Sequence, residues 1–234
     1  MTRGGRTIGT PRPVFNAEVQ ACMDAVAESY GLRVVHGFCD PESEIKAALQ
    51  SVMDEDAWDW GKGEDEWGNN NQMAPKYFND QIIKHETFAV VAYDKNNDDH
   101  PCCLLSVQFR GRRGAPQGAT YTLLWTQKEY RRKGYALFLT CYFSQFLEEG
   151  GQLDSGTYDR PSMIAFYQKH NWTESKKGSK LFSIPATQLQ AQAIALSQTV
   201  TGGAKKEEEA KPKSSAKKEQ PKKKARNVKA KASK

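Results

Sequence analysis

The stretch that decides the fold runs from residue 120 to residue 136 and reads TYTLLWTQKEYRRKGYA. Its first part, Thr120–Thr126, is rich in β-branched and aromatic residues and is typical of a strand. A turn follows, and a helix is expected from about Lys133 to Glu149. A glycine turn at a helix start can bind an anion, because the first amides lack an intrahelical partner and the helix dipole attracts negative charge. The pattern therefore predicts either a phosphate site or a plain basic turn before a surface helix.

The residues around this stretch predict an α/β domain. Further strands are expected at 32–38, 87–93, 102–110, 153–158 and 180–184. Helices are expected at about 16–30, 40–53, 77–84 and 161–170. The three strands between residues 87 and 126 are separated only by turns rich in Asp, Asn, Gly and Pro, which favours an antiparallel meander.

Charge divides the chain of 234 residues, which has a formal net charge of +6, into two parts. Residues 204–234 contain 12 Lys, 1 Arg and 4 Glu, a net of +9, which leaves −3 for residues 1–203. This segment has no aromatic residue, so it cannot bury enough apolar surface to offset its ordering entropy. Its lysines predict non-specific contact with DNA or RNA, and a purely solubilising tail is the alternative.

These patterns predict four segments. Residues 1–15 form a flexible N-terminal arm, 16–185 the folded domain, 186–200 a short amphipathic helix, and 201–234 a disordered basic tail of Lys, Ala, Pro and Ser.

The five cysteines include no C-x-x-C pair, which suits neither a disulfide framework nor a zinc site, so reduced, packed thiols and no metal are expected. No run of about 18 apolar residues is present, so no membrane contact is expected. The protein is expected to be intracellular. It would be cytoplasmic, or nuclear if the host has a nucleus, because residues 221–226 resemble a nuclear localisation signal.

Two motifs resemble those of the GNAT-type N-acetyltransferases. The first family motif is Arg or Gln, two residues, Gly, one residue, then Gly or Ala, and Arg131, Gly134 and Ala136 fill its places. The second is an Asn-x-x-Ala helix leading to Phe-Tyr and a closing Gly-Phe. Residues 162–172 are similar to it, with Ser162 in place of the Asn and Asn171-Trp172 in place of Gly-Phe.

The resemblance implies a GNAT-like acetyltransferase domain, with a mixed, mainly antiparallel central sheet flanked by helices and followed by the disordered tail. It implies acetyl-CoA as co-substrate, lying across splayed strands, with its pyrophosphate on the turn and its pantetheine along the strand backbone. The residues implied in coenzyme binding are Leu124, Trp125, Thr126, Arg131, Arg132, Lys133, Gly134, Tyr135, Ala136 and Ser162.

Tyr167 matches the place where the family often has the acid that protonates the leaving thiolate. A phenol with a reference pKa of about 10 is protonated at neutral pH and can donate to sulfur. The alternative is a core tyrosine whose hydroxyl finds a neighbour. No general base is assigned: Glu129 lies beside the turn and reads as structural, and Glu86 or a carboxylate of the acidic loop acting through water are the other candidates.

An acidic, tryptophan-rich loop spans residues 54–72. The resemblance places it at the acceptor wall, where carboxylates and indoles would suit a cationic amine such as a polyamine or a protein lysine. A solvated acidic face with inward tryptophans explains the same residues.

The function expected is transfer of acetyl from acetyl-CoA to a primary amine by direct attack in a ternary complex. One rival is a non-catalytic binding protein of the same fold, whose basic tail tethers it to nucleic acid. A second is a nucleic-acid packaging protein, although the negative charge of residues 1–203 argues against broad DNA contact outside the tail.

Overall fold

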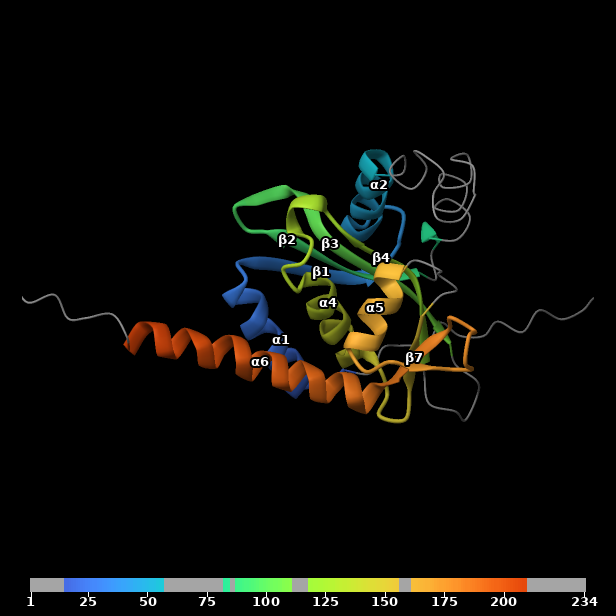
Figure 1. Cartoon of the computed structure of the whole chain (residues 1–234). Helices are drawn as coiled ribbons and strands as arrows, with labels where there is room; N and C mark the ends of the chain where they lie inside the picture. The colour runs from blue at the N-terminus through green and yellow to red at the C-terminus, as the bar shows by residue number, and fades with distance from the viewer. Residues whose placement is uncertain (1–14, 57–81, 85–86, 111–117, 156–160, 210–234) are drawn as a thin grey trace, which may run out of the picture.

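The computed structural model of the protein describes residues 15–56, 82–84, 87–110, 118–155 and 161–209 (Figure 1). Its strands are β1 (Leu32–Phe38), β2 (Thr87–Asp94), β3 (Asn97–Arg110), β4 (Gly118–Thr126), β5 (Gln152–Asp154), β6 (Thr173–Glu174) and β7 (Phe182–Pro185). Its helices are α1 (Ala17–Ser29), α2 (Glu44–Asp56), α4 (Tyr135–Phe143), α5 (Pro161–Lys169) and α6 (Ala186–Glu209). Two 3₁₀ turns, η2 (Lys128–Tyr130) and η3 (Ser144–Phe146), flank α4.

The strands form one seven-stranded sheet in the order β1-β2-β3-β4-β5-β7-β6. Strands β1 to β4 are a continuous antiparallel meander, β4 and β5 are parallel, and β5, β7 and β6 are again antiparallel. The fold class expected from the sequence, an α/β domain with a mixed and mainly antiparallel sheet flanked by helices, is confirmed.

Helices cover both faces of the sheet (Figure 1). On one face, α1, α4 and α6 bury a core that includes Met23, Phe138, Phe143 and Leu189. On the other, α2 packs Leu49 and its neighbours against the outward residues of β2, β3 and β4. No helix in the described ranges combines the length and apolar character that spanning a bilayer requires.

A bulge in β4 reverses the direction in which its side chains point. Val107 pairs with Tyr121 and the preceding residue, Ser106, pairs with Leu123, so Thr122 is an extra residue. Tyr121 therefore belongs to the core under α4, whereas Leu123 belongs to the core under α2. Strict alternation would have placed Tyr121 and Leu123 on the same face.

Strands β4 and β5 diverge soon after they meet. Among the described residues they pair at Ala119 with Leu153 and at Thr120 with Asp154. The pairing requires Gly118, since a Cβ there would lie 2.9 Å from the Gln152 carbonyl oxygen. From Tyr121 to Thr126, β4 pairs with β3, and its other edge has no strand partner in the part of the chain that the structure describes.

Most predicted elements are found, with different ends. Asn16 caps α1 as expected, because its Oδ1 accepts a 3.2 Å hydrogen bond from the Val19 amide. The helix predicted at 133–149 is shorter. It begins at Tyr135, after its N-cap Gly134, and a 3₁₀ turn follows it from Ser144. Strand β6 was not predicted from the sequence, and the helix from residue 186 continues to Glu209 instead of ending at 200. The segments 1–14 and 210–234 lie outside the described residues.

Candidate functional site

The turn between β4 and α4 has the backbone geometry of an anion site. Gly134 is the N-cap of α4 with φ 89°, and no side chain caps this helix end. The first helical hydrogen bond runs from the Phe138 amide to the Gly134 carbonyl at 2.9 Å, so the amides of Tyr135, Ala136 and Leu137 have no acceptor inside the helix. The turn is solvent-exposed from Arg131 to Gly134. Free amides, the positive end of the helix dipole and an exposed approach favour a phosphate.

The three cations of the turn have different surroundings. Arg131 folds back on the strand, where its Nε donates a 2.9 Å hydrogen bond to the Thr126 carbonyl. Lys133 places its Nζ 5.0 Å from the centre of the Tyr130 ring. Arg132 has φ 66°, the left-handed conformation, within the turn. The turn thus holds three exposed cationic side chains.

Three tyrosine rings pack together next to the turn, and two of them, those of Tyr30 and Tyr130, were not predicted from the sequence as part of the site. The Tyr135 ring lies 5.5 Å from that of Tyr30 and 5.8 Å from that of Tyr130. The Tyr130 hydroxyl donates a 2.9 Å hydrogen bond to Oδ2 of Asp94 at the end of β2. A Cβ on Gly134 would lie 3.5 Å from the Tyr30 hydroxyl. These contacts join segments far apart in sequence, so no local pattern indicated them.

Hydrogen bonds hold the pKa of Asp94 below its usual range, first from the Asn96 amide and then from Tyr130. Burial, with the hydrogen bond to Asp94, raises the pKa of Tyr130 to about 12. The pair is therefore a carboxylate and a neutral phenol at neutral pH.

The β4 residues expected along the pantetheine have divergent side chains. Leu124 is half-buried toward the α4 side, and Trp125 is buried on the α2 side. Thr126 is half-buried, with Oγ1 3.2 Å from the Cys103 thiol. Their common feature is that their backbone lies on the edge of β4 that has no strand partner among the described residues.

Tyr167 lies in an aromatic cluster where β4 and β5 part. Its ring is 4.8 Å from Trp172 and 5.1 Å from Phe182, and Trp172 is 5.4 Å from Tyr121, the first β4 residue beyond the pairing with β5. Tyr167 is 1% exposed, and its hydroxyl has no hydrogen-bond partner among the described residues. Burial raises the pKa of this phenol well above 10. Tyr167 is thus a neutral buried donor with an unused hydrogen.

The neighbouring Tyr121 hydroxyl is fully engaged. It lies 2.7 Å from Oγ1 of Thr140, which itself donates a 2.8 Å hydrogen bond to the Ala136 carbonyl. Since the Thr140 hydrogen is committed to that carbonyl, Tyr121 is the donor to Thr140. Burial raises the pKa of Tyr121, and the nearby Tyr167 phenol raises it further by charge repulsion.

The departure of Asn171-Trp172 from the Gly-Phe of the family motif has a structural explanation. Asn171 has φ 60°, a conformation that asparagine tolerates better than most residues. The Trp172 amide donates to the Tyr167 carbonyl at 2.9 Å and the Asn171 amide to the Gln168 carbonyl at 3.3 Å, which is a Schellman cap. Trp172 makes the apolar contact with Tyr167 that accompanies this cap. Asn171 and Trp172 therefore end α5 with a Schellman cap.

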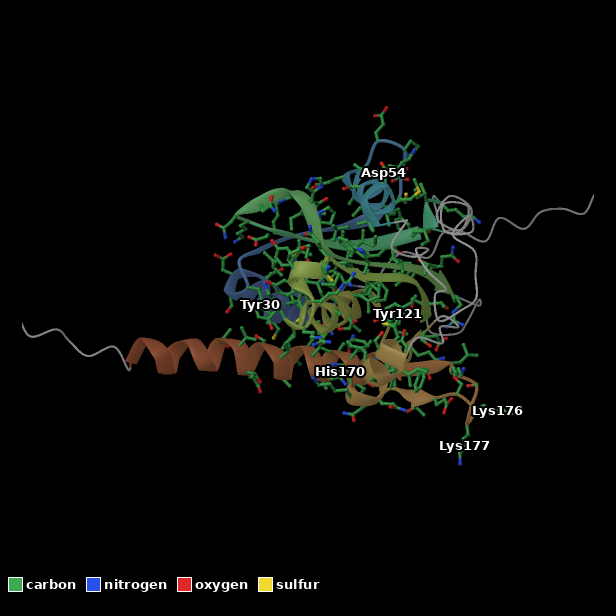
Figure 2. All side chains as sticks on the ribbon, turned by 45° about the horizontal axis from the view of Figure 1, so that its top comes forward. Tyr30, Asp54, Tyr121, His170, Lys176 and Lys177 are labelled. Carbon is green, nitrogen blue, oxygen red and sulfur yellow. The ribbon has the colours of Figure 1, made fainter. Side chains whose placement is uncertain are left out.

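The other candidate site residues predicted from the sequence are exposed on the surface of the domain or lie outside the described residues. Ser162 is exposed in the first turn of α5, and Glu129 is exposed in η2. Asp54 is exposed on α2, on the opposite face of the sheet from His170 and α6 (Figure 2). Most of the acidic loop, from residue 57 onward, and Glu86 lie outside the described residues.

The cysteines are free, and all but Cys22 are buried. Burial raises the pKa of the Cys102, Cys103 and Cys141 thiols to about 12, which makes them poor nucleophiles. No group of three or more metal-ligating side chains occurs within the described ranges.

A groove of about 250 Å³ adjoins the turn between α4, α5 and α6. It is lined by Leu137, Lys169, His170, Asn171, Gln192, Ala195, Leu196 and Thr199. Leu137 lies one turn along α4 from Gly134, so the groove begins beside the helix start.

No protein-family model matches the chain, and no curated protein matches it in sequence. Several solved structures are similar in shape, at low identity. A chain of the NatC complex bound to Gag peptide and CoA has a TM-score of 0.40 and 12% identity, over 65% of this chain and 98% of that one. An aminoglycoside acetyltransferase from an uncultured soil metagenomic sample, in complex with sisomicin, has a TM-score of 0.39 and 12% identity, over 61% and 88%. A chain of the KacTA–DNA complex has a TM-score of 0.42 and 12% identity, over 69% and 97%.

Proposed function

We propose that the protein is an N-acetyltransferase that moves an acetyl group from acetyl-CoA to a primary amine in a ternary complex. The observation that carries the proposal is the uncapped start of α4 at Gly134, which follows β4 through η2. From Tyr121 onward, one edge of β4 has no strand partner among the described residues. An anion site at the end of an open strand edge suits a ligand with a pyrophosphate and a long, hydrogen-bonding arm.

In this proposal the pyrophosphate binds the amides from Gly134 to Leu137, and the cations of the turn neutralise its charge. The pantetheine arm pairs with the free edge of β4 and so brings the thioester to the place where β4 and β5 part. The nucleoside end extends toward the groove beside Leu137, where Lys169 supplies a cation for its phosphate.

The chemistry is acyl transfer in one displacement. The neutral amine attacks the thioester carbonyl carbon, a tetrahedral oxyanion forms, and the carbon–sulfur bond breaks to give the amide and a thiolate. Tyr167 donates its hydrogen to that sulfur, the attacking nitrogen loses a proton to water as the amide forms, and the Tyr167 phenolate regains a proton from water. Its unpartnered hydroxyl supports this role, because a buried phenol normally has an acceptor and this one has none among the described residues.

The acceptor is a cationic amine, such as a polyamine or a protein lysine, which loses its proton before attack. The acidic residues at the end of α2 would attract it from the face opposite α6. The base stays unassigned, since Glu129 is exposed on η2 and the other candidate carboxylates lie outside the described residues.

The test is thiol release from acetyl-CoA with a panel of polyamines, lysine peptides, aminoglycosides and arylalkylamines. We expect acceptor-dependent release with one amide formed per thiol, verified by mass spectrometry. Calorimetry with CoA runs in parallel. CoA binding without turnover on any amine would favour the non-catalytic binding protein, and absence of CoA binding would overturn the proposal.

A further inference from the structure

The end of α5 leaves backbone carbonyls that its own cap does not use. The Schellman cap takes the carbonyls of Tyr167 and Gln168. Those of His170 and Asn171, at the negative end of the helix, still need donors.

Helix α6 supplies these donors from two glutamines. Gln192 Nε2 donates a 2.8 Å hydrogen bond to the His170 carbonyl, and Gln188 Nε2 donates a 3.2 Å hydrogen bond to the Asn171 carbonyl. Residues four apart lie on the same face of a helix, so one face of α6 holds both carbonyls. The position of His170 against α6 is visible in Figure 2.

Helix α6 is itself held by the main core and by backbone contacts away from α5. Leu189 and Ala193 are buried in the main core, and the Ala186 amide donates to the Gly151 carbonyl at 2.9 Å. A third glutamine, Gln190, donates a 3.3 Å hydrogen bond to the Ser144 carbonyl of η3, away from α5. Because α6 is held by the core, its glutamines can hold the C-terminal end of α5 in a fixed position relative to the core.

We propose that Gln188 and Gln192 are positioning residues of the transfer site: by holding the His170 and Asn171 carbonyls they fix the Schellman cap, and the cap fixes the Tyr167 ring against Trp172. The inference rests on the proposed function of Tyr167 as proton donor to the thiolate. It makes α6, which contributes no atom to the chemistry, a part of the catalytic unit.

Replacing Gln192 by glutamate tests this hydrogen bond specifically. Gln192 Oε1 is buried with no hydrogen-bond partner among the described residues, so its amide nitrogen faces the carbonyl and its oxygen does not. Gln192→Glu keeps the shape but replaces the donor by an oxygen that repels the carbonyl. Gln192→Lys keeps a donor, and a cation is favourable at a helix C-terminus. Gln190→Glu is the matched control, since it makes the same change on the same helix at a contact remote from α5.

The first measurement is the kcat and KM of the full chain carrying Gln188→Glu with Gln192→Glu. We expect kcat at saturating acetyl-CoA to fall about tenfold, because small misplacements of a reacting group are costly. The KM for acetyl-CoA should rise as well, because Gln192 lines the groove proposed for the nucleoside phosphate, so kcat is the diagnostic quantity. Gln192→Lys should retain most of kcat, and Gln190→Glu should change it less than twofold. The paired glutamate substitutions should have no further effect on kcat in a Tyr167→Phe background, because both changes remove the same proton donation. A full tenfold effect in that background, or an equal loss in Gln190→Glu, would overturn the inference.

The second measurement does not depend on turnover. With fluorotyrosine incorporated, the ¹⁹F resonance of Tyr167 is identified by its loss in Tyr167→Phe. We expect it to shift or broaden in the paired glutamate variant and to stay unchanged in Gln190→Glu. An unchanged Tyr167 resonance in the paired glutamate variant would disprove positioning by the glutamines, whether or not the wild type transfers an acetyl group. If that resonance changes but the wild type has no transferase activity, the proposed function is wrong and the positioning by the glutamines stands.

Discussion

The Tyr130 hydroxyl donates a 2.9 Å hydrogen bond to Oδ2 of Asp94, which ties the turn after β4 to the end of β2. Lys133 also lies over the Tyr130 ring, so this phenol connects a carboxylate on one side and a cation of the candidate phosphate turn on the other. Its ring contact with Tyr135 extends the connection into the first turn of α4. The turn that would hold a pyrophosphate is therefore preorganised by a residue outside the family motif.

Tyr130→Phe should raise the pKa of Asp94 toward its ordinary value, because the hydrogen bond from Tyr130 is lost, while those from Asn96 remain. A lowered carboxyl pKa stabilises the fold above the unfolded-state pKa, and that contribution is lost as pH falls through the folded pKa. The variant should thus lose stability at neutral pH and show a smaller further loss on acidification. Titration of the Asp94 carboxyl by NMR checks this, and an unchanged pKa would show that the hydrogen bond is not formed in solution.

Gly134→Ala should weaken CoA binding by about tenfold, or ~1.4 kcal/mol, because the left-handed turn is strained by a Cβ and the amides move off the phosphate. Gly178→Ala is the control: Gly178 has φ 79°, and a Cβ there would have nothing within 4 Å. The two substitutions carry similar backbone strain, so calorimetry separates strain from the site. Equal CoA affinity in both folded variants would rule out the phosphate role of this turn.

Tyr167→Phe should lower kcat by on the order of 10²-fold with little change in CoA affinity, since the hydroxyl acts only as the thiolate forms. The same change should leave the free energy of unfolding unchanged or raise it by about 1 kcal/mol, because it removes a buried hydroxyl without a hydrogen-bond partner among the described residues. Tyr121→Phe is the comparison: its hydroxyl is bonded to Thr140, so its loss should cost about 1 kcal/mol. A kcat change below threefold when chemistry limits the rate would make Tyr167 a packing residue.

Neutralising Asp54, Glu55, Asp56 and Asp59 together should raise the KM for a cationic acceptor several-fold and leave the KM for acetyl-CoA unchanged, because the lost charges attract only the acceptor. Neutralising Glu18 and Glu149, which are exposed beside α6, is the control for charge alone. Steady-state kinetics at two salt concentrations should show the acceptor effect shrinking as salt rises. Equal changes for both substrates would point to a structural role for these residues.

Truncation after Glu209 should abolish retention on duplex DNA and preserve turnover on a small free amine. Residues 210–234 carry ten Lys, one Arg and one Glu, so their loss changes the formal charge from +6 to −4. Binding by the full chain should be independent of DNA sequence, with a salt slope of about −0.9 per phosphate neutralised. Because the truncation leaves α6 intact, it tests the tethering role of the tail without changing the hydrogen bonds from α6 to the end of α5. DNA retention by the truncated protein would exclude the tail as the tether.

Features that depend on neighbours along the chain could be predicted from the sequence. The Asn16 cap, the strand at 120–126 followed by the turn at Gly134, and the helix at Pro161 were all indicated by local patterns, because capping and strand periodicity involve residues only a few positions apart. The position of the candidate phosphate turn and of Tyr167 in the element order followed from these patterns and the family resemblance.

The tertiary structure decided what depends on distant partners. The bulge at Thr122 comes from the register with β3, and it places Leu123 on the face opposite Tyr121. The contact of Tyr121 with Trp172 also depends on the packing of residues far apart in sequence. The contact of Tyr130 with Asp94 spans 36 residues, and the capping of the His170 carbonyl by Gln192 spans 22. The sequence indicated the candidate residues of the turn, because short-range backbone preferences form the turn. The surroundings that orient Tyr167 and the turn arise only when the sheet pairs and α6 packs, because those contacts join residues that no local pattern relates.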